Sequence, residues 1–333
     1  MAYSNRIWVY GPVGLLGLLA LLYSVFWRVE ADMLAARLDR ANGGEIMPGV
    51  LFAFAGKSIG GFPFRLDTLL DGVSFEHDGP EGPTAWRAEK LALHALTYGR
   101  PLYIFEAAGL QSFEWTDPSG GPPRLITLTP GVARASAILR NGKLARFDLD
   151  LWQPLAKDAS QGADAARTLS AARAQLHLLH NSDNSVEVAV KIDEARLGEG
   201  YRPALGGDIA VLDLRGKLSA GESLTSLTAG AESVFDGTEH WRQSGGKLDV
   251  QKLTLRWAGL KTDLQGALGL DGFHRPDGTL RGSIDAGEIV SALTGGKLNL
   301  SAANTPTATV SLQFKDGDIK LAAGSAFIGG ASR

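Results

Sequence analysis

The stretch VEVAVKID at residues 186–193 alternates apolar with mostly polar residues. Because successive side chains of a β-strand point to opposite faces of its sheet, this pattern predicts a strand with one apolar and one solvated face. The apolar side consists of Val186, Val188, Val190 and Ile192. The same alternation suits a closed core and also an open, curled sheet whose apolar face lines a groove. The sequence alone leaves both structures open.

The same period of two continues on the C-terminal side of this stretch. Residues 264–270 repeat it, and residues 248–257 repeat it with a change of phase near Gln251 and Lys252, which predicts a β-bulge. Glycine, at 42 of 333 residues, is about twice as frequent as usual, which is typical of a turn-rich β protein. We therefore expect a mainly β fold in which curled antiparallel sheet follows an N-terminal helix, with few short helices besides.

One internal segment interrupts this pattern. Residues 156–174, AKDASQGADAARTLSAARA, are rich in alanine and charge and poor in β-branched residues, which favours a helix. A helical connection over residues 153–172 would separate a first β half, residues 45–152, from a second, residues 173–333. Residues 286–293 predict a further helical turn or two.

The N-terminal region is apolar enough to cross a membrane. Residues 7–27, IWVYGPVGLLGLLALLYSVFW, are 21 residues without an acidic, basic or histidine side chain. A helix of this length spans roughly 31 Å, about the hydrocarbon thickness of a bilayer. A cleaved signal peptide is the alternative, but residues 23–28 are bulky where the cleavage site of a signal peptide has small side chains. We expect an uncleaved transmembrane helix with residues 1–6 in the cytoplasm.

The orientation follows from the size of the C-terminal part. More arginines follow the span than precede it, yet long domains cross the membrane largely regardless of such charges. We expect a single-pass protein of the bacterial inner membrane with its large C-terminal domain in the periplasm. Residues 28–44 predict an amphipathic linker helix with Met33, Leu34, Leu38 and Ala41 on one face, stopping at the following glycines. This helix would lie on the membrane surface or pack as a stalk on the first strands.

The search for reactive chemistry is negative. The chain has no cysteine and a net charge of −3, which disfavours thiolate chemistry and nucleic-acid binding. His177 and His180 would face opposite sides of a strand and so could not share a metal. Asp148 and Asp150 would share a face and could serve as acid and base, but a solvated strand face looks the same. We expect no catalytic residue, metal or cofactor, and no enzyme.

The segment GFPFRLD is unusual in composition. It comprises Gly61, Phe62, Pro63, Phe64, Arg65, Leu66 and Asp67. If it is an extended strand, Phe62 and Phe64 lie buried together on one face, while Arg65 and Asp67 pair on the other. Pro63 cannot donate a hydrogen bond, so such a strand starts or edges a sheet.

Several segments together resemble a known family. They are GFPFRLD (61–67), WRAEKLAL (86–93), YGRPL (98–102), RPALGG leading into IAVLDLRG (202–216), and LTLRW leading to GALGLD (253–271). They resemble the alphaproteobacterial family of membrane-anchored proteins known as domain of unknown function 2125. That resemblance implies no established activity and no residue roles. The strand-rich pattern after one anchor is also distantly similar to the AsmA-like envelope proteins, which implies a curled sheet with an apolar groove for lipid chains.

Two kinds of function fit these expectations best. In the first, the periplasmic β domain shields or binds lipid, such as a phospholipid or glycolipid, and contributes to envelope maintenance or lipid transport. Val186, Val188, Val190 and Ile192 would then line the apolar groove. In the second, the protein is a non-enzymatic structural or protein-interaction module at the inner membrane.

Overall fold

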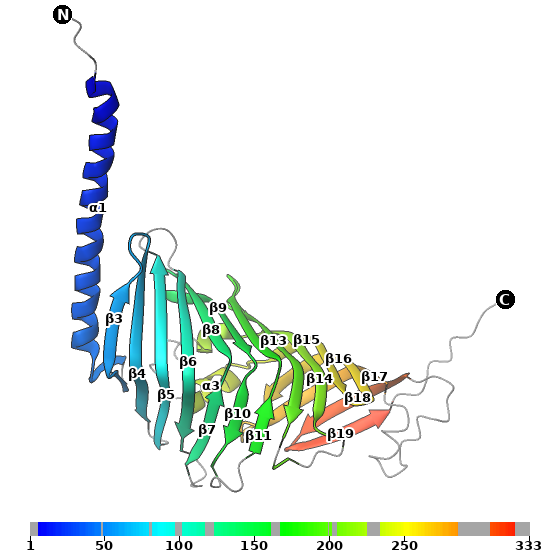
Figure 1. Ribbon diagram of the computed structural model, residues 1–333. Helices are drawn as coiled ribbons and strands as arrows, with labels where there is room; N and C mark the ends of the chain where they lie inside the picture. The colour runs from blue at the N-terminus through cyan, green and yellow to red at the C-terminus, as the bar shows by residue number, and fades with distance from the viewer. Residues whose placement is uncertain are drawn as a thin grey trace, which may run out of the picture.

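One long helix and one large antiparallel sheet make up most of the protein (Figure 1). In the part of the chain that the structure describes, the sheet has nineteen strands, and it curls away from the helix, which stands at one end beside β3 (Figure 1). The computed structural model describes residues 6–47, 49–79, 82–96, 102–116, 123–160, 167–198, 200–201, 205–224, 234–285 and 307–323.

The helix α1 (Arg6–Ala41) is continuous and has two parts. Its apolar first part is exposed on all sides, whereas Trp27 and Ala31 are buried and Leu38 and Ala41 pack on the first strands. Lys57 holds this second part to β3, because its Nζ donates to the Ala35 carbonyl at 2.8 Å. The predicted linker helix is therefore the C-terminal part of α1 and packs as a stalk.

The helix α1 ends where the sequence predicts, but its packed face differs from the predicted one. The helix ends at Ala41, and Gly43 follows with a φ of +74°, a conformation that glycine adopts without strain. Met33, expected on the packed face, is exposed. The packed stripe instead runs from Trp27 through Ala31 to Leu38, at the spacing of successive helical turns.

The strands follow one another along the chain with few helices between them. The first six are β1 (Gly44–Met47), β2 (Val50–Ala53), β3 (Gly56–Gly60), β4 (Arg65–Gly79), β5 (Gly82–Leu96) and β6 (Leu102–Trp115). The next six are β7 (Arg124–Thr129), β8 (Val132–Arg140), β9 (Lys143–Trp152), β10 (Leu155–Asp158), β11 (Arg167–Ser170) and β12 (Arg173–His180). The last seven are β13 (Val186–Leu197), β14 (Asp208–Leu218), β15 (Leu248–Trp257), β16 (Leu260–Leu270), β17 (Pro276–Asp285), β18 (Thr307–Lys315) and β19 (Asp318–Ala323).

Between β6 and β13 the sheet consists of two rows of shorter strands that lie end to end. β6 pairs with both β7 and β8. One row of pairings runs through β7, β10 and β11, the other through β8, β9 and β12, and both end on β13. β7 and β8 are the two parts of one kinked strand, as are β9 and β10, and β11 and β12. From β13 to β19 each strand pairs with the next in sequence.

A line of irregular residues, which we name the crease, crosses the strands where these kinks occur. It passes through Ala55, Gly72, Glu89, Gly109, Gly131, Gln153, Ala172 and Glu194. Gly72, Gly109, Gln153 and Glu194 have positive φ, and the register of β5 against β6 shifts at Glu89. Bulges of this kind bend a strand and increase its twist, so the crease contributes to the curl of the sheet.

In the described part of residues 153–172, which leaves out 161–166, the expected helix is wrong. That segment contains β10 and β11, whose backbones pair with each other and, on their outer sides, with β7 and β13. Hydrogen bonding to strands on both sides outweighs the intrinsic helix propensity of alanine, as at Ala156, which pairs with Leu128 and Leu169. β9 also pairs with β12, so the two expected halves form one sheet.

The described residues between β14 and β15 contain two short helical elements. They are the 3₁₀-helix η2 (Gly221–Leu224) and the helix α3 (Val234–Gln243), neither of which was predicted. Trp241 of α3 is buried and donates from Nε1 to the Ser219 carbonyl at 2.7 Å, which holds α3 at the end of β14. The helical turn predicted over 286–293 lies outside the described residues. The bulge predicted near Gln251 is confirmed, since the register of β15 against β16 shifts between Val250 and Leu253.

Candidate functional site

A single row of paired residues crosses the sheet from β4 to β17. Residues that pair directly across two strands lie on the same face of the sheet. In order, the row consists of Leu70, Leu91, Ala107, Ala133, Leu151, Ala174, Ile192, Leu212, Leu255, Thr262 and Ile284. Every member except Thr262 is apolar. We name the side of the sheet that carries this row the apolar face.

The predicted groove residues all lie on the apolar face. β13 pairs regularly with β12 and β14 over residues 186–192, so Val186, Val188, Val190 and Ile192 share one side. Val190, for example, lies between Leu176 and Leu214, its partners on the two neighbouring strands. All four residues are half-buried.

Apart from the small side chain of Ala133 on β8, the buried clusters of the apolar face lie at its two ends. At the first end, Phe52, Leu70 and Val73 form a cluster that the C-terminal part of α1 covers. At the other end, a cluster contains Val250 and Leu280. Among the described residues, neither cluster takes a member from β8, β9, β12 or β13, which we name the middle strands.

Glycines on the apolar face let the far end curl tightly. Gly266 pairs with Val250 on one side and Leu280 on the other, so a residue without a side chain separates two large ones. Its φ is +150°, and a Cβ atom there would lie 2.1 Å from the Thr279 carbonyl oxygen. Only glycine fits that approach of the two backbones.

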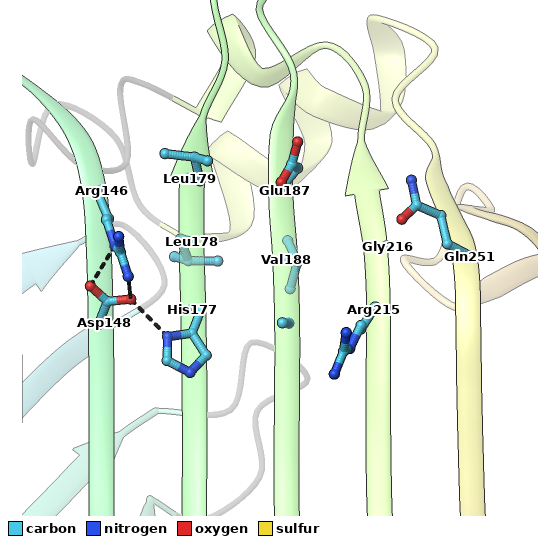
Figure 2. A pocket seen from close by; sticks show the side chains of 11 residues that line it. Arg146, Asp148, His177, Leu178, Leu179, Glu187, Val188, Arg215, Gly216 and Gln251 are labelled. Carbon is cyan, nitrogen blue, oxygen red and sulfur yellow. Dashed lines mark hydrogen bonds and ion pairs between the residues drawn. The ribbon is translucent and has the colours of Figure 1, made fainter.

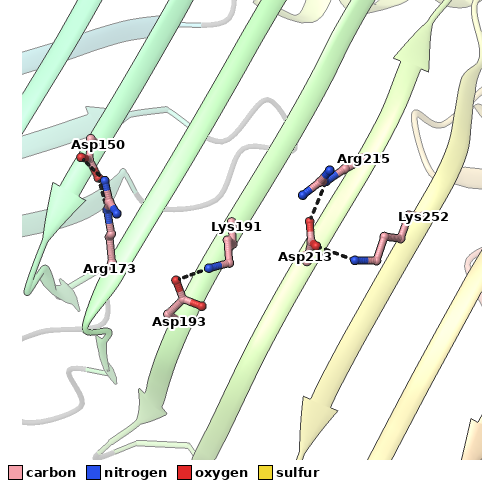
Figure 3. A network of polar contacts seen from close by, with 7 residues as sticks. All are labelled: Asp150, Arg173, Lys191, Asp193, Asp213, Arg215 and Lys252. Atoms are coloured by element: carbon pink, nitrogen blue, oxygen red, sulfur yellow. Dashed lines mark hydrogen bonds and ion pairs between the residues drawn. The ribbon is translucent and has the colours of Figure 1, made fainter.

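The opposite face of the middle strands and of the neighbouring β14 and β15 carries ion pairs (Figure 3). Arg173 donates two hydrogen bonds to Asp150, at 2.8 and 2.7 Å, and Lys252 donates one to Asp213 at 2.8 Å. The hydrogen bonds from Arg173 lower the pKa of Asp150. Burial raises the pKa of Asp213, but Lys252 and Arg215 outweigh it and the pKa is lowered. This side of the sheet is therefore polar and ionised at neutral pH.

A shallow pocket of about 300 Å³ lies on the polar side, with Arg146, Asp148, His177, Glu187 and Arg215 in its lining (Figure 2). Asp148 accepts hydrogen bonds from Arg146 Nε at 2.8 Å and faces His177 Nδ1 at 2.7 Å. Burial raises the pKa of Asp148, but these two partners outweigh it and the pKa is lowered. A general acid needs the opposite shift, so the arrangement is that of an ion-pair cluster.

The histidines lie as the sequence predicts. His177 pairs with Ala189 and reaches Asp148 on the polar side, whereas His180 pairs with Val186 of the apolar face. Within the part of the chain that the structure describes, no group of three or more histidine, aspartate or glutamate side chains is placed to hold a metal ion.

The GFPFRLD segment is a turn that leads into a strand, so its predicted extended conformation is wrong. β3 ends at Gly60 and β4 begins at Arg65. Between them Gly61 has a φ of +94°, and the Arg65 amide donates to the Gly61 carbonyl at 3.0 Å. Phe62 and Phe64 are 54% and 62% exposed, because the reversal places them beyond the end of the sheet. Their predicted burial is also wrong.

The rest of the segment behaves as expected. Arg65 pairs with Asp67 at 3.1 Å, the ion pair that the alternation predicts, and His94 Nδ1 lies 2.6 Å from the same carboxylate. Leu66 pairs with Ala95 of β5 and takes no part in the contacts of the Asp67 carboxylate.

The turn is bound to α1, a contact that sequence reasoning missed. Tyr23 donates from its hydroxyl to the Pro63 carbonyl at 2.6 Å, and Trp27 Nε1 donates to the Arg65 carbonyl at 2.8 Å. The rings of Trp27 and Phe62 meet edge to face with centroids 5.4 Å apart. Nothing in the sequence identifies the partners of Tyr23 and Trp27, which lie 40 and 38 residues further along the chain.

A family model described as "Uncharacterized protein conserved in bacteria (DUF2125)" matches residues 27–325. The chain belongs to this family. The matched region of the DUF2125 protein begins at Trp27, so it contains all of the sheet and the packed part of α1, and it leaves out most of the exposed apolar part. No curated protein and no solved structure matches the chain. The family assignment agrees with the resemblance of the GFPFRLD segment, and it carries no activity.

Proposed function

We propose that this DUF2125 protein is a single-pass protein of the bacterial inner membrane whose periplasmic sheet holds the acyl chains of a phospholipid or glycolipid on its apolar face. It would contribute to envelope maintenance or lipid transport without catalysing a reaction. The observation that carries the proposal is the apolar face itself, continuous from β4 to β17 and half-buried on the middle strands. Large apolar surfaces of this kind generally mark a binding site.

The structure of α1 supports a retained anchor. Among the described residues, one helix is long and apolar enough to span a membrane, and it lies near the N-terminus. That helix continues without a break into its packed part, where Trp27 is 8% exposed and hydrogen-bonded to β4. Cleavage after the apolar segment would remove Tyr23 and Trp27 from the turn that they hold. A signal peptide has no such structural role in the mature protein.

The nature of the ligand follows from the surface and its tether. Apart from His180 at the end of β12, the middle strands offer aliphatic and aromatic side chains on the apolar face, such as Phe147, Leu176 and Val190. Acyl chains complement such a surface because they bury apolar area and require no hydrogen bonds. In a protein anchored to a bilayer, lipid is the apolar molecule at highest local concentration.

A second candidate is a protein-interaction module. Among the described residues, β19 pairs with β18 alone, and its Ile319 is exposed. An unpaired strand edge is a template for pairing with another chain. A protein strand, rather than lipid, would then be the partner.

Site-specific photo-crosslinking in living cells distinguishes these functions. The full chain is expressed with p-benzoylphenylalanine in place of Val190, and in a matched variant in place of Lys191, which points to the polar face of the same strand. We expect lipid adducts, identified by mass spectrometry, at position 190 and none at 191. Protein adducts alone at position 190 would support the interaction module. No adduct at position 190 would mean a closed face, and either result would overturn lipid binding.

A further inference from the structure

The turn at residues 61–64, which we name the aromatic turn, exposes two phenylalanine side chains at a defined place. Exposure alone is not distinctive, because Phe273 in the turn before β17 is 79% exposed. The aromatic turn differs in being bound to α1 by a hydrogen bond at Pro63, a second at the adjacent Arg65 of β4, and a ring contact at Phe62. Its position relative to the apolar part of the helix is therefore set by the fold.

These contacts place the aromatic turn beside the last turn of the apolar segment. The Arg65 carbonyl is level with Trp27 and the Pro63 carbonyl is level with Tyr23, four residues nearer the N-terminus. Four helical residues rise about 6 Å, so the chain climbs along α1 toward the apolar segment as it passes from Arg65 back to Pro63. Figure 1 shows the β3–β4 end of the sheet beside α1, and the helix projecting beyond it.

The chemistry around the turn changes in the order that a membrane interface requires. Phe62 and Phe64 lie level with Tyr23 and Trp27, residue types that favour the membrane–water interface. Charged groups begin directly after these aromatic residues, both on the helix and after the turn. Arg28 follows Trp27 and pairs with Asp32, and Arg65 follows Phe64 and pairs with Asp67. The change from apolar to charged residues therefore occurs at the same level on the helix and on the turn.

We infer that the aromatic turn inserts Phe62 and Phe64 into the interfacial region of the lipid leaflet from which the domain emerges. This inference rests on the proposed function in one respect, namely that α1 is a membrane anchor. The turn gives the domain a second attachment to the bilayer and prevents it from rotating freely about the helix. It also brings the start of β4, and with it the first end of the apolar face, to the lipid surface.

The absence of cysteine from the chain allows a direct test. The full chain carrying Phe64→Cys is labelled with an environment-sensitive fluorophore and reconstituted in nanodiscs of phosphatidylethanolamine and phosphatidylglycerol. We expect a blue-shifted emission that lipids with a nitroxide at acyl carbon 5 quench more strongly than lipids with a nitroxide on the headgroup. Phe273→Cys is the matched control, an exposed phenylalanine on a turn that α1 does not touch, and neither lipid should quench its label.

A third variant separates failure of the inference from failure of the anchor. A label at Leu16→Cys, in the exposed apolar part of α1, should be quenched by nitroxides deep in the acyl chains. If the Leu16 label is quenched and the Phe64 label is not, the aromatic turn stays in water and the inference is wrong while the anchor stands. If neither is quenched, α1 does not span the bilayer and both proposals fail.

Discussion

The two ends of the apolar face are packed differently from its middle, although one row of paired residues joins them. Leu70 and Leu280 are 5% and 1% exposed, whereas Leu176 and Val190 on the middle strands are half-buried. At the first end α1 supplies the cover, and at the far end glycines such as Gly266 let the sheet curl. The difference teaches that an alternating strand pattern specifies a face, and that what covers the face decides whether it becomes a core.

The largest expected effect tests whether the ends are the true core. Leu280→Ala should destabilise the full chain in detergent by about 2–5 kcal/mol, the range for a fully buried leucine. Leu176→Ala removes the same atoms from a half-buried site and should cost about half as much or less. Chemical unfolding followed by tryptophan fluorescence measures both. Equal losses would show that the middle strands are as closed as the ends, and would break the comparison.

A smaller effect tests the curl at the far end. Gly266→Ala introduces a Cβ atom next to the Thr279 carbonyl oxygen and forces an unfavourable φ, which should cost about 1–3 kcal/mol. Gly269→Ala, three residues later on β16, is the matched control. Its Cβ would have no neighbour nearer than 3.6 Å, so a change within about 0.5 kcal/mol is expected. Similar midpoints for the two variants in thermal unfolding would argue against a role for glycine in the curl.

The sequence predicts the faces of the strands better than it predicts their connections. The alternation at Val186–Ile192 is local, because side-chain direction within a strand depends only on position, and the structure confirms it. The bulge near Gln251 is readable for the same reason. The segment at Ala156 was misjudged because its strand state depends on pairing with β7 and β11, both of which require knowledge of the register.

In the candidate site, too, local features could be predicted from the sequence and long-range contacts could not. Gly61 followed by a phenylalanine and a proline is a recognisable turn signal, which the strand interpretation of Phe62 and Phe64 overlooked. The partners of that turn, Tyr23 and Trp27, depend on where α1 lies against β4 and could not be predicted. The alignment of the crease across many strands likewise depends on register, although each isolated glycine within it was visible.

The smallest expected effect concerns the ion-paired carboxylates on the polar side of the sheet, at and beside the middle strands. Arg173 lowers the pKa of Asp150, and Lys217 and Ser185 lower that of Asp183 to about 2. A carboxyl whose folded pKa lies below its unfolded value, near 3.9, stabilises the fold above that pH and loses this contribution as the pH falls through the folded pKa. Thermal stability should therefore be nearly constant from about pH 5 to 7 and decline below about pH 4.

Asp150→Asn isolates one carboxyl of this set. Its ion pair with Arg173 is partly exposed, so at pH 7 the melting temperature should fall by only about 2 °C or less. Between about pH 4 and 2 the variant should decline less steeply than the parent, because it has one fewer carboxylate to protonate. High salt should reduce the difference, since it screens a solvent-accessible pair. An Asp150→Asn profile parallel to that of the parent would show that this pair contributes nothing to the acid sensitivity, and that the middle strands depend on their apolar face and backbone pairing alone.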